Sequence, residues 1–395
     1  MWSYIIDAVR SPIGRRNGTL SVMRGDDLAA QVLNGLVGRH DLDPAEIEDV
    51  QMGCVTQIGE QAWNIGRMAV MAAGWPVEVC GTTVDRQCGS SMQTNFNGAA
   101  AVMAGQLDVV VSAGVEMMSR VPMGSNGGSI SERITDRFEI VMQGTSAELL
   151  AHEWSLTREA LDAYSLESHR RALAASDSGK FEREIIPIQL PEEVEPEDPS
   201  TGLLQAGGTA VAAPPVFAVD EAPRRETSAE KLASLKPAFR ADGTVTAGNA
   251  SGINDGAAAL VIASEERAAA LGVEPLGEFV GSAVTGVDPR VMGIGPIPAV
   301  RRLLARAGVD LADIDLVELN EAFASQGVAV IRELGLDEER VNVNGGAIAL
   351  GHPLGMSGAR LVVSLLHELG RRDGHLGLAT LCVGVGQGQA ALFRR

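Results

Sequence analysis

The sequence is poor in aromatic residues and in lysine. Aromatic side chains make up 4% of its 395 residues, and lysine occurs only at positions 180, 231 and 236. No run of about eighteen apolar residues occurs, and the N-terminus lacks the pattern of a signal peptide, so we expect neither membrane insertion nor export. The four cysteines form no CxxC pair, so no metal site is expected. Unpaired cysteines are typical of a reducing compartment, so we expect a cytoplasmic protein.

Positive charge is scarce as well. The formal net charge is −19, and almost all cationic residues are arginines. We therefore expect no nucleic-acid partner, because the phosphate backbone would be repelled over most of the surface. An anionic substrate must instead find arginines gathered locally. A chain of 395 residues also exceeds the usual size of one hydrophobic core, which predicts two or three domains.

A helix, a short turn and an apolar strand occur twice in the chain. Gly35–Gly53 aligns without gaps with Arg302–Asn320. The matched pairs are Leu36 and Leu303, Arg39 and Arg306, Asp43 and Asp310, Ala45 and Ala312, Ile47 and Ile314, and Val50 and Val317. Each copy continues into a Gly-rich turn, a helix and another apolar strand. Apolar strands that alternate with helices predict two α/β halves with parallel strands and helices on the sheet faces.

Residues from about Ser119 to Gly248 interrupt this pattern and are predicted to be an insertion. Helices are expected at about Thr145–Trp154 and Arg158–Ala175, the second capped by Thr157. The acidic, Pro-rich stretch from Pro187 to Pro215 is expected to be exposed. An insertion of this size above the working face of the fold is expected to supply substrate contacts.

Cys88 lies between an apolar run that ends near Val84 and a helix that begins with small residues. This position predicts a sulfur at a helix N-terminus, where free N–H groups and the helix dipole lower the pKa of a thiol. A small buried core cysteine is the alternative. By the same alternative, Cys54 and Cys80 are predicted to be core residues.

Two further segments contain residues that suit acid–base catalysis or the binding of an oxyanion. His352 lies between glycines and a proline, which predicts a base held by a tight turn, with a structural histidine as the alternative. Cys382 ends a predicted strand and enters a Gly-rich turn whose free N–H groups suit an oxyanion. This turn leads into a strand near the C-terminus, not into a helix, so a dinucleotide-binding loop is disfavoured.

Asn320 and Glu321 follow the predicted strand Leu316–Leu319 at its carboxyl end, where ligands gather in open α/β sheets. A buried pair of this kind suits an ordered water or a substrate oxygen. Asn320 as the cap of the following helix is the alternative. The other histidines are assigned no function; they are His40, His152, His169, His367 and His375.

Taken together, these segments resemble the thiolase family over essentially the whole chain. The matching segments are Arg86–Ser90, Gly248–Gly256, Asn320–Phe323, Gly345–Gly358 and Cys382–Gly384. The resemblance implies an α/β thiolase fold, with two similar halves in a five-layered core and an inserted loop domain. The implied domains are 1–118 with 249–272 as the N-terminal half, 119–248 as the loop domain, and 273–395 as the C-terminal half.

The resemblance also implies a reaction and its residues. A thiolase cleaves a 3-oxoacyl-CoA to acetyl-CoA and a shortened acyl-CoA, or runs the reverse condensation, with coenzyme A as substrate and no tightly bound cofactor. By resemblance, Cys88 is the acylated nucleophile, His352 the activating base, and Cys382 the acid that protonates C2. Asn320 would hold a water, and the N–H groups of Cys88 and Gly384 would form an oxyanion hole. Ser251 and Arg224 match positions that contact coenzyme A.

The family further implies a homodimer or homotetramer and, for its degradative members, a role in fatty acid β-oxidation. An acetoacetyl-CoA-forming biosynthetic thiolase and a non-catalytic acyl-CoA-binding subunit are the alternatives. A decarboxylating condensing enzyme is disfavoured, because it needs no acid at Cys382. Two segments depart from the family pattern. Val385 stands where many relatives have glycine, and Met142–Glu148 matches only loosely, so acyl preference stays open.

Overall fold

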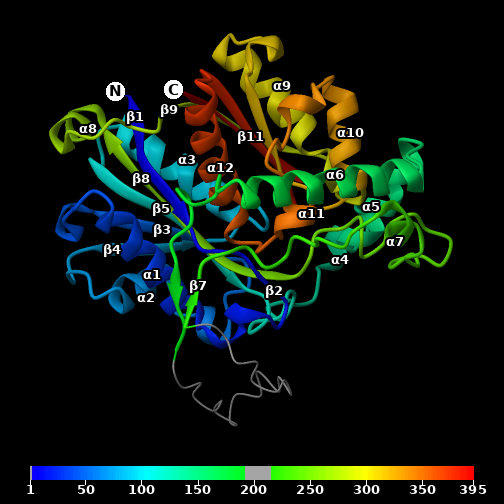
Figure 1. The fold of residues 1–395 in the computed structure, drawn as a ribbon, viewed down its shortest axis with the longest axis horizontal. Helices are drawn as coiled ribbons and strands as arrows, with labels where there is room; N and C mark the ends of the chain where they lie inside the picture. The colour runs from blue at the N-terminus through cyan, green and yellow to red at the C-terminus, as the bar shows by residue number, and fades with distance from the viewer. Residues whose placement is uncertain (1, 192–214) are drawn as a thin grey trace.

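The computed structural model describes residues 2–191 and 215–395, and its main sheet runs through most of the molecule (Figure 1). The strands follow the order β4-β3-β5-β8-β1-β9-β12-β11-β10, and a short strand β2 pairs with β8. Their bounds are β1 Ser3–Arg10, β2 Gly14–Arg15, β3 Asp49–Gly53, β4 Cys80–Val84, β5 Val109–Met117, β8 Asn254–Ser264, β9 Gly277–Gly286, β10 Leu316–Leu319, β11 Leu376–Val383 and β12 Gln387–Arg394.

This order contains the same arrangement twice. In the first half, β4, β3 and β5 are parallel to one another, and β8 and β1 continue the sheet in antiparallel pairs. In the second half, a bridge at Val341, then β10 and β11, run parallel, and β12 and β9 follow antiparallel. The two halves meet where Tyr4 and Ile5 of β1 pair with β9. The prediction of parallel strands is therefore correct for the start of each half and wrong for the last two strands of each.

Helices separate and cover the two halves. Their bounds are α1 Gly25–Gly38, α2 Ile65–Ala72, α3 Ser90–Met103, α8 Glu265–Leu271, α9 Pro296–Ala307, α10 Ala324–Leu334, α11 Ala347–Leu350 and α12 Ser357–Arg372. Figure 1 shows α1 and α2 at one side, α9 and α10 at the other, and α3 and α12 between them. This is the five-layered order of helices, sheet, helices, sheet and helices that the family resemblance implied.

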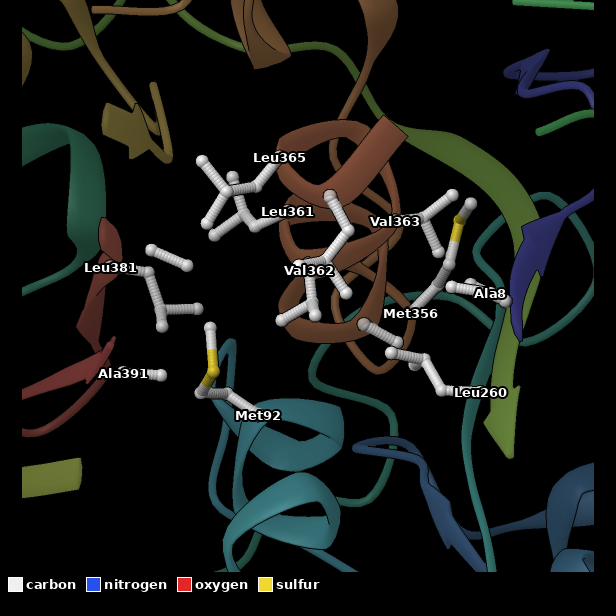
Figure 2. Close-up of a cluster of buried hydrophobic side chains, with 14 of the residues drawn as sticks. Ala8, Met92, Leu260, Met356, Leu361, Val362, Val363, Leu365, Leu381 and Ala391 are labelled. Carbon is white, nitrogen blue, oxygen red and sulfur yellow. The ribbon is translucent and has the colours of Figure 1, made fainter. Parts of the chain in front are cut away.

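The strands β5, β8, β10, β11 and β12 are buried on both faces, as strands between two helical layers must be. Along β8, Leu260 and Ile262 face the central helices, whereas Val261 between them faces α1 and α2. The central helix α12 is buried almost all round. Figure 2 shows its Leu361 toward Leu381 of β11 and its Val363 on the side of Leu260 and Ala8. One apolar core thus joins both halves.

The duplicated sequence pattern forms the same structure twice. Helix α1 leads through a short 3-10 turn at Pro44–Glu46 into β3, and α9 leads through one at Leu311–Asp313 into β10. Helix α9 begins with Pro296, whose missing N–H costs nothing in the first turn. It ends at Gly308, which adopts the left-handed conformation common at helix ends. The predicted internal repeat is confirmed.

The region between β5 and β8 packs over one end of this core. Its described elements are α4 Glu132–Thr135, α5 Gln143–Glu153, α6 Arg158–Asp177, β6 Ile188–Gln189, β7 Val216–Phe217 and α7 Ala229–Ala233. Thr157 caps α6, and its hydroxyl accepts the Ala160 N–H as predicted. The fully buried Arg10 of β1 pairs with Glu184 and Asp220 and so fixes this region to the first half. The domain boundaries at residues 119 and 248 stay a prediction.

Two further predictions concern the Pro-rich stretch and the cysteines Cys54 and Cys80. Residues 192–214 of the Pro-rich stretch lie outside the described residues. Cys54 is buried as predicted, but Cys80 is exposed at the start of β4, so its placement in the core was wrong. The reason is that β4 is the last strand of the sheet, with no described neighbour on its outer edge. Among the described helices, none is long and apolar enough to cross a membrane.

Candidate active site

Cys88 is held in a tight turn between β4 and α3. The preceding residue, Gln87, has a φ of 48°, a left-handed conformation that costs roughly 1–3 kcal/mol. The Ser90 hydroxyl fixes the turn, because it accepts the Arg86 N–H at 2.9 Å and donates to the Gln87 carbonyl at 2.6 Å. Cys88 directly precedes Gly89, the N-cap of α3, as predicted. Its sulfur therefore has one fixed position, at the N-terminus of a helix.

The predicted lowering of the Cys88 pKa is wrong for the free protein. Burial raises the pKa of its thiol to about 11, although the N–H groups of Gly384 and of Cys88 itself point at the sulfur. Desolvation opposes the thiolate more strongly than two N–H groups favour it. Cys88 therefore rests as a thiol and needs a base to become a nucleophile.

Cys382 and Gly384 lie at the carboxyl end of β11, beside Cys88. Gly384 reaches across from the second half to offer its N–H to the Cys88 sulfur. Burial and then the charge of a Cys88 thiolate raise the pKa of the Cys382 thiol. Two thiols close enough for this effect, both protonated at neutral pH, can act as one nucleophile and one acid.

His352 is held by a turn that sets its protonation. The Ser357 hydroxyl donates to the Pro353 carbonyl at 2.7 Å, so the imidazole Nδ1, at 2.6 Å from that hydroxyl, is assigned as the N–H donor. This leaves Nε2 free to accept a proton. Burial and the charge of Arg360 lower the pKa of His352 to about 3. The imidazole is therefore neutral, as a base must be.

Asn320 stands at the end of β10 and faces this imidazole. Its Nδ2 lies 3.3 Å from the His352 Nε2, and its backbone N–H donates to the Thr380 carbonyl of β11 at 3.0 Å. Its Oδ1 is buried and has no hydrogen-bond partner among the described residues. Buried amide oxygens are normally satisfied, so this atom marks a place for a water or a substrate group. Helix α10 is capped by Phe323, so the alternative of Asn320 as a helix cap is wrong.

The predicted catalytic residues are thus brought together from both halves. β10 and β11 are neighbouring parallel strands, with Leu319 paired to Thr380, so Asn320 and Cys382 lie at the same sheet edge. Asn320 contacts His352, and the turn after Cys382 contacts Cys88. The first half supplies Cys88, and the second half supplies Asn320, His352, Cys382 and Gly384.

The two residues predicted to contact coenzyme A are placed differently from each other. The Ser251 N–H donates to the Ala322 carbonyl at 3.0 Å, two residues beyond Asn320, so Ser251 borders the site. Arg224 is exposed, and its N–H donates to the His169 Nδ1 at 3.2 Å. No described contact of Arg224 connects it to the catalytic groups.

Two buried carboxylates that support the site were not identified from the sequence as supports. Glu116 of β5 accepts the N–H groups of Val55, Thr56 and Gly355, and so holds the turn that carries His352 against the first half. Glu321, predicted to order a water or substrate oxygen with Asn320, is instead occupied by four donors. They are the Tyr164 hydroxyl, the Ser168 hydroxyl, the Asn342 amide and the Ile348 N–H. No spacing motif signals contacts between residues so distant in sequence.

Comparison with known proteins agrees with this geometry. The family model described as the thiolase N-terminal domain matches residues 3–266, and the one for the thiolase C-terminal domain matches 273–395. A 3-oxoadipyl-CoA/3-oxo-5,6-dehydrosuberyl-CoA thiolase of Escherichia coli K12 is 44% identical, over 100% of this chain and 99% of its own. A 3-ketoacyl-CoA thiolase of Psychrobacter cryohalolentis is 42% identical, over 99% of this chain and 97% of its own.

A solved structure is also similar. The crystal structure of the Bacillus anthracis acetyl-CoA acetyltransferase matches with a TM-score of 0.88 and 44% identity, over 100% of this chain and 98% of that one. The family models together span nearly the whole chain, and the relatives align along their full length. The chain belongs to the thiolase family.

Proposed function

We propose that this thiolase works through an acyl group carried on Cys88, and that its substrate is a 3-oxoacyl-CoA whose short acyl chain ends in a carboxylate. Thiolytic cleavage of a 3-oxoacyl-CoA, or the reverse condensation, is the reaction of the family, and coenzyme A takes part in it as a substrate. The observation that supports the mechanism is the pair of neighbouring thiols, Cys88 and Cys382, which are both protonated. The Gly384 N–H also points at the Cys88 sulfur.

The chemistry follows from the protonation of these groups. The neutral His352 takes the proton of the Cys88 thiol, and the thiolate attacks the 3-oxo carbon. The C2–C3 bond then breaks, and Cys382 gives its proton to C2 of the departing acetyl-CoA. The N–H groups of Cys88 and Gly384 stabilise the oxygen that becomes negative at the acyl carbon. A free coenzyme A thiol then gives its proton to the Cys382 thiolate and takes the acyl group, and the Cys88 thiolate that leaves recovers its proton from the His352 imidazolium.

Asn320 is proposed to act at a second oxygen that becomes negative during the reaction, the enolate oxygen of acetyl-CoA. We propose that a water held by its unpartnered Oδ1, together with the imidazole of His352, faces the enolate oxygen of acetyl-CoA. Ser251, at the rim of the site, is proposed to contact coenzyme A, and so is the exposed Arg224. Arg224 lies within the proposed loop domain, residues 119–248, and Ser251 lies just beyond its end.

A carboxylate at the end of the acyl chain is supported by a cavity beside the turn that follows Cys382. The cavity has a volume of about 570 Å³ and is lined by Arg137, Phe138 and Arg290 among others. It adjoins the turn after Cys382, because the Val287 N–H in its wall donates to the Gly386 carbonyl at 2.8 Å. Arg290 is paired with Asp288 at 2.9 Å, whereas the Arg137 guanidinium has no ion pair with any described residue. Arg137 is therefore a cation without an ion partner among the described residues in a wall that also holds the carboxylates of Glu139 and Asp288, and we propose that it binds the anionic acyl end.

The name of the Escherichia coli relative, a 3-oxoadipyl-CoA thiolase, agrees with an acid-terminated substrate. It moves the proposal away from the unsubstituted chains of fatty acid β-oxidation. The second candidate is acetoacetyl-CoA formation from two acetyl-CoA molecules, which the similar acetyl-CoA acetyltransferase of Bacillus anthracis favours. An arginine that binds a carboxylate at the acyl end has no role in that reaction, because the acyl groups of acetyl-CoA and acetoacetyl-CoA carry no carboxylate.

We further propose a cytoplasmic homodimer, with a homotetramer as the alternative. The four cysteines are all free, which suits a reducing compartment. The outer edge of β4 has no described partner strand, and such edges invite pairing with another chain.

Substrate profiling tests the proposal. The protein is mixed with free coenzyme A and, in separate reactions, 3-oxoadipyl-CoA, 3-oxohexanoyl-CoA and acetoacetyl-CoA, and the mass of the Cys88 peptide is followed. We expect the highest kcat/KM for 3-oxoadipyl-CoA and an acyl adduct on Cys88. Product without an adduct on the trapped enzyme contradicts the mechanism, and a preference for acetoacetyl-CoA supports the second candidate.

The Arg137→Ala variant tests directly whether Arg137 binds the carboxylate at the acyl end. We expect its kcat/KM for 3-oxoadipyl-CoA to fall ~10-fold, because a charge-assisted contact is lost, while the value for 3-oxohexanoyl-CoA stays unchanged. Arg133→Ala is the matched control, since Arg133 is exposed on α4 of the same segment and does not line the cavity. Equal losses for both substrates would count against the proposed role.

A further inference from the structure

The side chain of Gln387 connects the two turns that carry the candidate active site. Its Oε1 accepts a hydrogen bond from the Arg86 Nη1 at 3.0 Å, and its Nε2 donates to the Gly384 carbonyl at 3.5 Å. Arg86 lies two residues before Cys88 in the first half, whereas Gly384 and Gln387 lie between β11 and the start of β12 in the second half. One amide thus joins the turn of the sulfur to the turn of the N–H that points at it.

The orientation of this amide is fixed by its two neighbours. A guanidinium can only donate, so the amide atom that faces Arg86 must be the oxygen. A backbone carbonyl can only accept, so the atom that faces Gly384 must be the nitrogen. A reversed amide would place donor against donor and acceptor against acceptor, and both hydrogen bonds would be lost. Gln387 therefore forms a bridge with one direction, from the guanidinium to the carbonyl.

Arg86 is part of the same short segment that holds the sulfur. Its carbonyl accepts the Gly89 N–H at 3.0 Å, and its own N–H donates to the Ser90 hydroxyl at 2.9 Å. These two bonds close the turn around Cys88. The side chain of Arg86 therefore starts from the turn of the nucleophile and ends on Gln387, in the other half of the molecule.

The backbone of Gln387 is held firmly on its other side. It pairs with Val383 and with Gly286 in antiparallel ladders. A Cβ at Gly295 would stand 2.1 Å from the Gln387 carbonyl oxygen, so this close approach requires glycine. The amide thus projects from a fixed backbone. The Gly384 carbonyl that it contacts belongs to a turn of three residues between paired positions.

The two turns also lie against each other without hydrogen bonds. A Cβ at Gly384 would be 3.2 Å from the Gln87 side chain, and a Cβ at Gly89 would be 2.8 Å from the Val383 side chain. These contacts set how closely the turns can approach. They do not oppose separation or sliding, whereas a hydrogen-bonded bridge across the gap does.

We propose that Gln387 is a positioning residue, which through Arg86 holds the Gly384 N–H beside the Cys88 sulfur. A donor stabilises developing charge only when it is aimed at the oxygen that becomes negative, so a displacement of about 1 Å removes much of its effect. The inference rests on the proposed function, in which Cys88 carries the acyl group. It adds to that function a contact between the halves that lies outside the catalytic set.

Two variants and a control test the bridge. Gln387→Met keeps the length of the side chain and removes both hydrogen bonds, and Arg86→Met removes the donor at the other end. Gln106→Met is the matched control, because Gln106 is exposed beyond the end of α3 that is far from Cys88. Thermal unfolding reports whether each variant folds like the wild type.

The first measured quantity is the rate at which acetyl-CoA acetylates Cys88, followed by the mass of the protein. The acetyl group passes from the sulfur of coenzyme A to that of Cys88, and the thiol proton passes to coenzyme A. An oxyanion develops at the acetyl carbon, so we expect Gln387→Met and Arg86→Met each to slow this step at least ~10-fold at saturating acetyl-CoA. The double variant should be no slower than either single variant, because one bridge is broken only once. Gln106→Met should keep the wild-type rate.

The second quantity separates the aim of the N–H from the position of the sulfur. When iodoacetamide alkylates Cys88, the sulfur displaces iodide and no oxyanion develops at the carbon. We expect alkylation at pH 9 to change far less than acetylation in both bridge variants. Equal losses in the two reactions would show that the sulfur itself is displaced, which overturns the inference.

Acetylation at the wild-type rate in Gln387→Met also overturns the inference, and so do losses that multiply in the double variant. A loss in Arg86→Met that appears only as a higher acetyl-CoA requirement overturns it as well, because Arg86 would then bind the substrate itself. These results leave the proposed function standing, since the wild type still carries the acetyl group on Cys88. A wild type that acetyl-CoA does not acetylate at Cys88 contradicts the proposed function instead, before any variant is compared.

Discussion

At the scale of single residues, the protonation of Cys88 is the feature that most constrains the mechanism. Its buried thiol has a pKa raised to about 11, and the neighbouring imidazole has a pKa lowered to about 3. Between these values both groups are neutral. In the proposed mechanism the proton therefore moves from sulfur to nitrogen during the reaction, because both groups are neutral beforehand.

This protonation predicts how the alkylation of Cys88 depends on pH. A group with a raised pKa carries little thiolate at neutral pH, and its thiolate fraction grows about tenfold per pH unit below that pKa. We expect the rate of modification by iodoacetamide to rise steadily from pH 7 to pH 10, measured by the mass of the Cys88 peptide. A plateau that begins below pH 8 would show a lowered pKa and contradict this account. Cys88→Ala measures the background from other cysteines.

The Cys382→Ala variant should separate two steps of the reaction, cleavage of the C2–C3 bond and transfer of the acyl group. Cleavage needs an acid at C2, so we expect thiolysis to fall ~10²–10⁴-fold, the usual size of an acid–base contribution. Exchange of the acetyl group between acetyl-CoA and labelled coenzyme A needs only Cys88 and His352, so it should persist. Loss of both activities together, in a variant that unfolds at the wild-type temperature, would assign Cys382 a different role.

At the scale of elements, the contacts of Glu116 join β5 to the turn that carries His352. Three backbone N–H groups, from Val55, Thr56 and Gly355, donate to its buried carboxylate at 2.9–3.0 Å. Burial raises its pKa, and these donors oppose the rise. A residue in the first half thus positions a base in the second.

Glu116→Gln should therefore affect stability and catalysis together. The amide replaces one acceptor with a donor that faces other donors, so we expect a loss of about 1–3 kcal/mol in the free energy of unfolding. We also expect a lower kcat with little change in KM, because His352 shifts while the rim of the site stays in place. Urea unfolding and steady-state kinetics measure both. Glu274→Gln is the control, because Glu274 is exposed, and an effect of equal size there would weaken the argument.

The elements also show how far sequence patterns reach. Periodicity and the matched pairs, such as Leu36 with Leu303, predicted the repeat, because each helix and strand carries its own apolar face. The antiparallel return of β8 and β12 was not predicted, since a strand buried on both faces has the same composition in either direction. The Cys88 pKa was misjudged for a related reason. The sequence places the sulfur at a helix N-terminus, but burial comes from residues hundreds of positions away.

At the scale of the whole molecule, the edge strand β4 is the proposed contact between two copies. Trp63 is 84% exposed, and the adjacent Asn64 donates to the Gly81 carbonyl of β4 at 2.8 Å. An exposed tryptophan beside an unpaired strand edge is typical of a protein interface.

The mass in solution tests this contact. We expect the wild type to have about twice its chain mass of 41.3 kDa, and Trp63→Asp to have the mass of one chain, by light scattering at micromolar concentration. Trp2→Asp is the control, because Trp2 is also half exposed but precedes β1 on another part of the sheet. If both variants keep the wild-type mass, the edge of β4 is not the interface.

The short pairing of β1 with β9, where the two halves meet, has a consequence for how the reaction is divided between them. The halves repeat one another in architecture, yet in the proposed mechanism they divide the reaction unequally, since Cys88 belongs to one and His352 and Cys382 to the other. Neither half is a smaller version of the enzyme. In that mechanism a motion that separates the halves would also separate Cys88 from His352 and Cys382, so the core that α3 and α12 share would hold the proposed active site together.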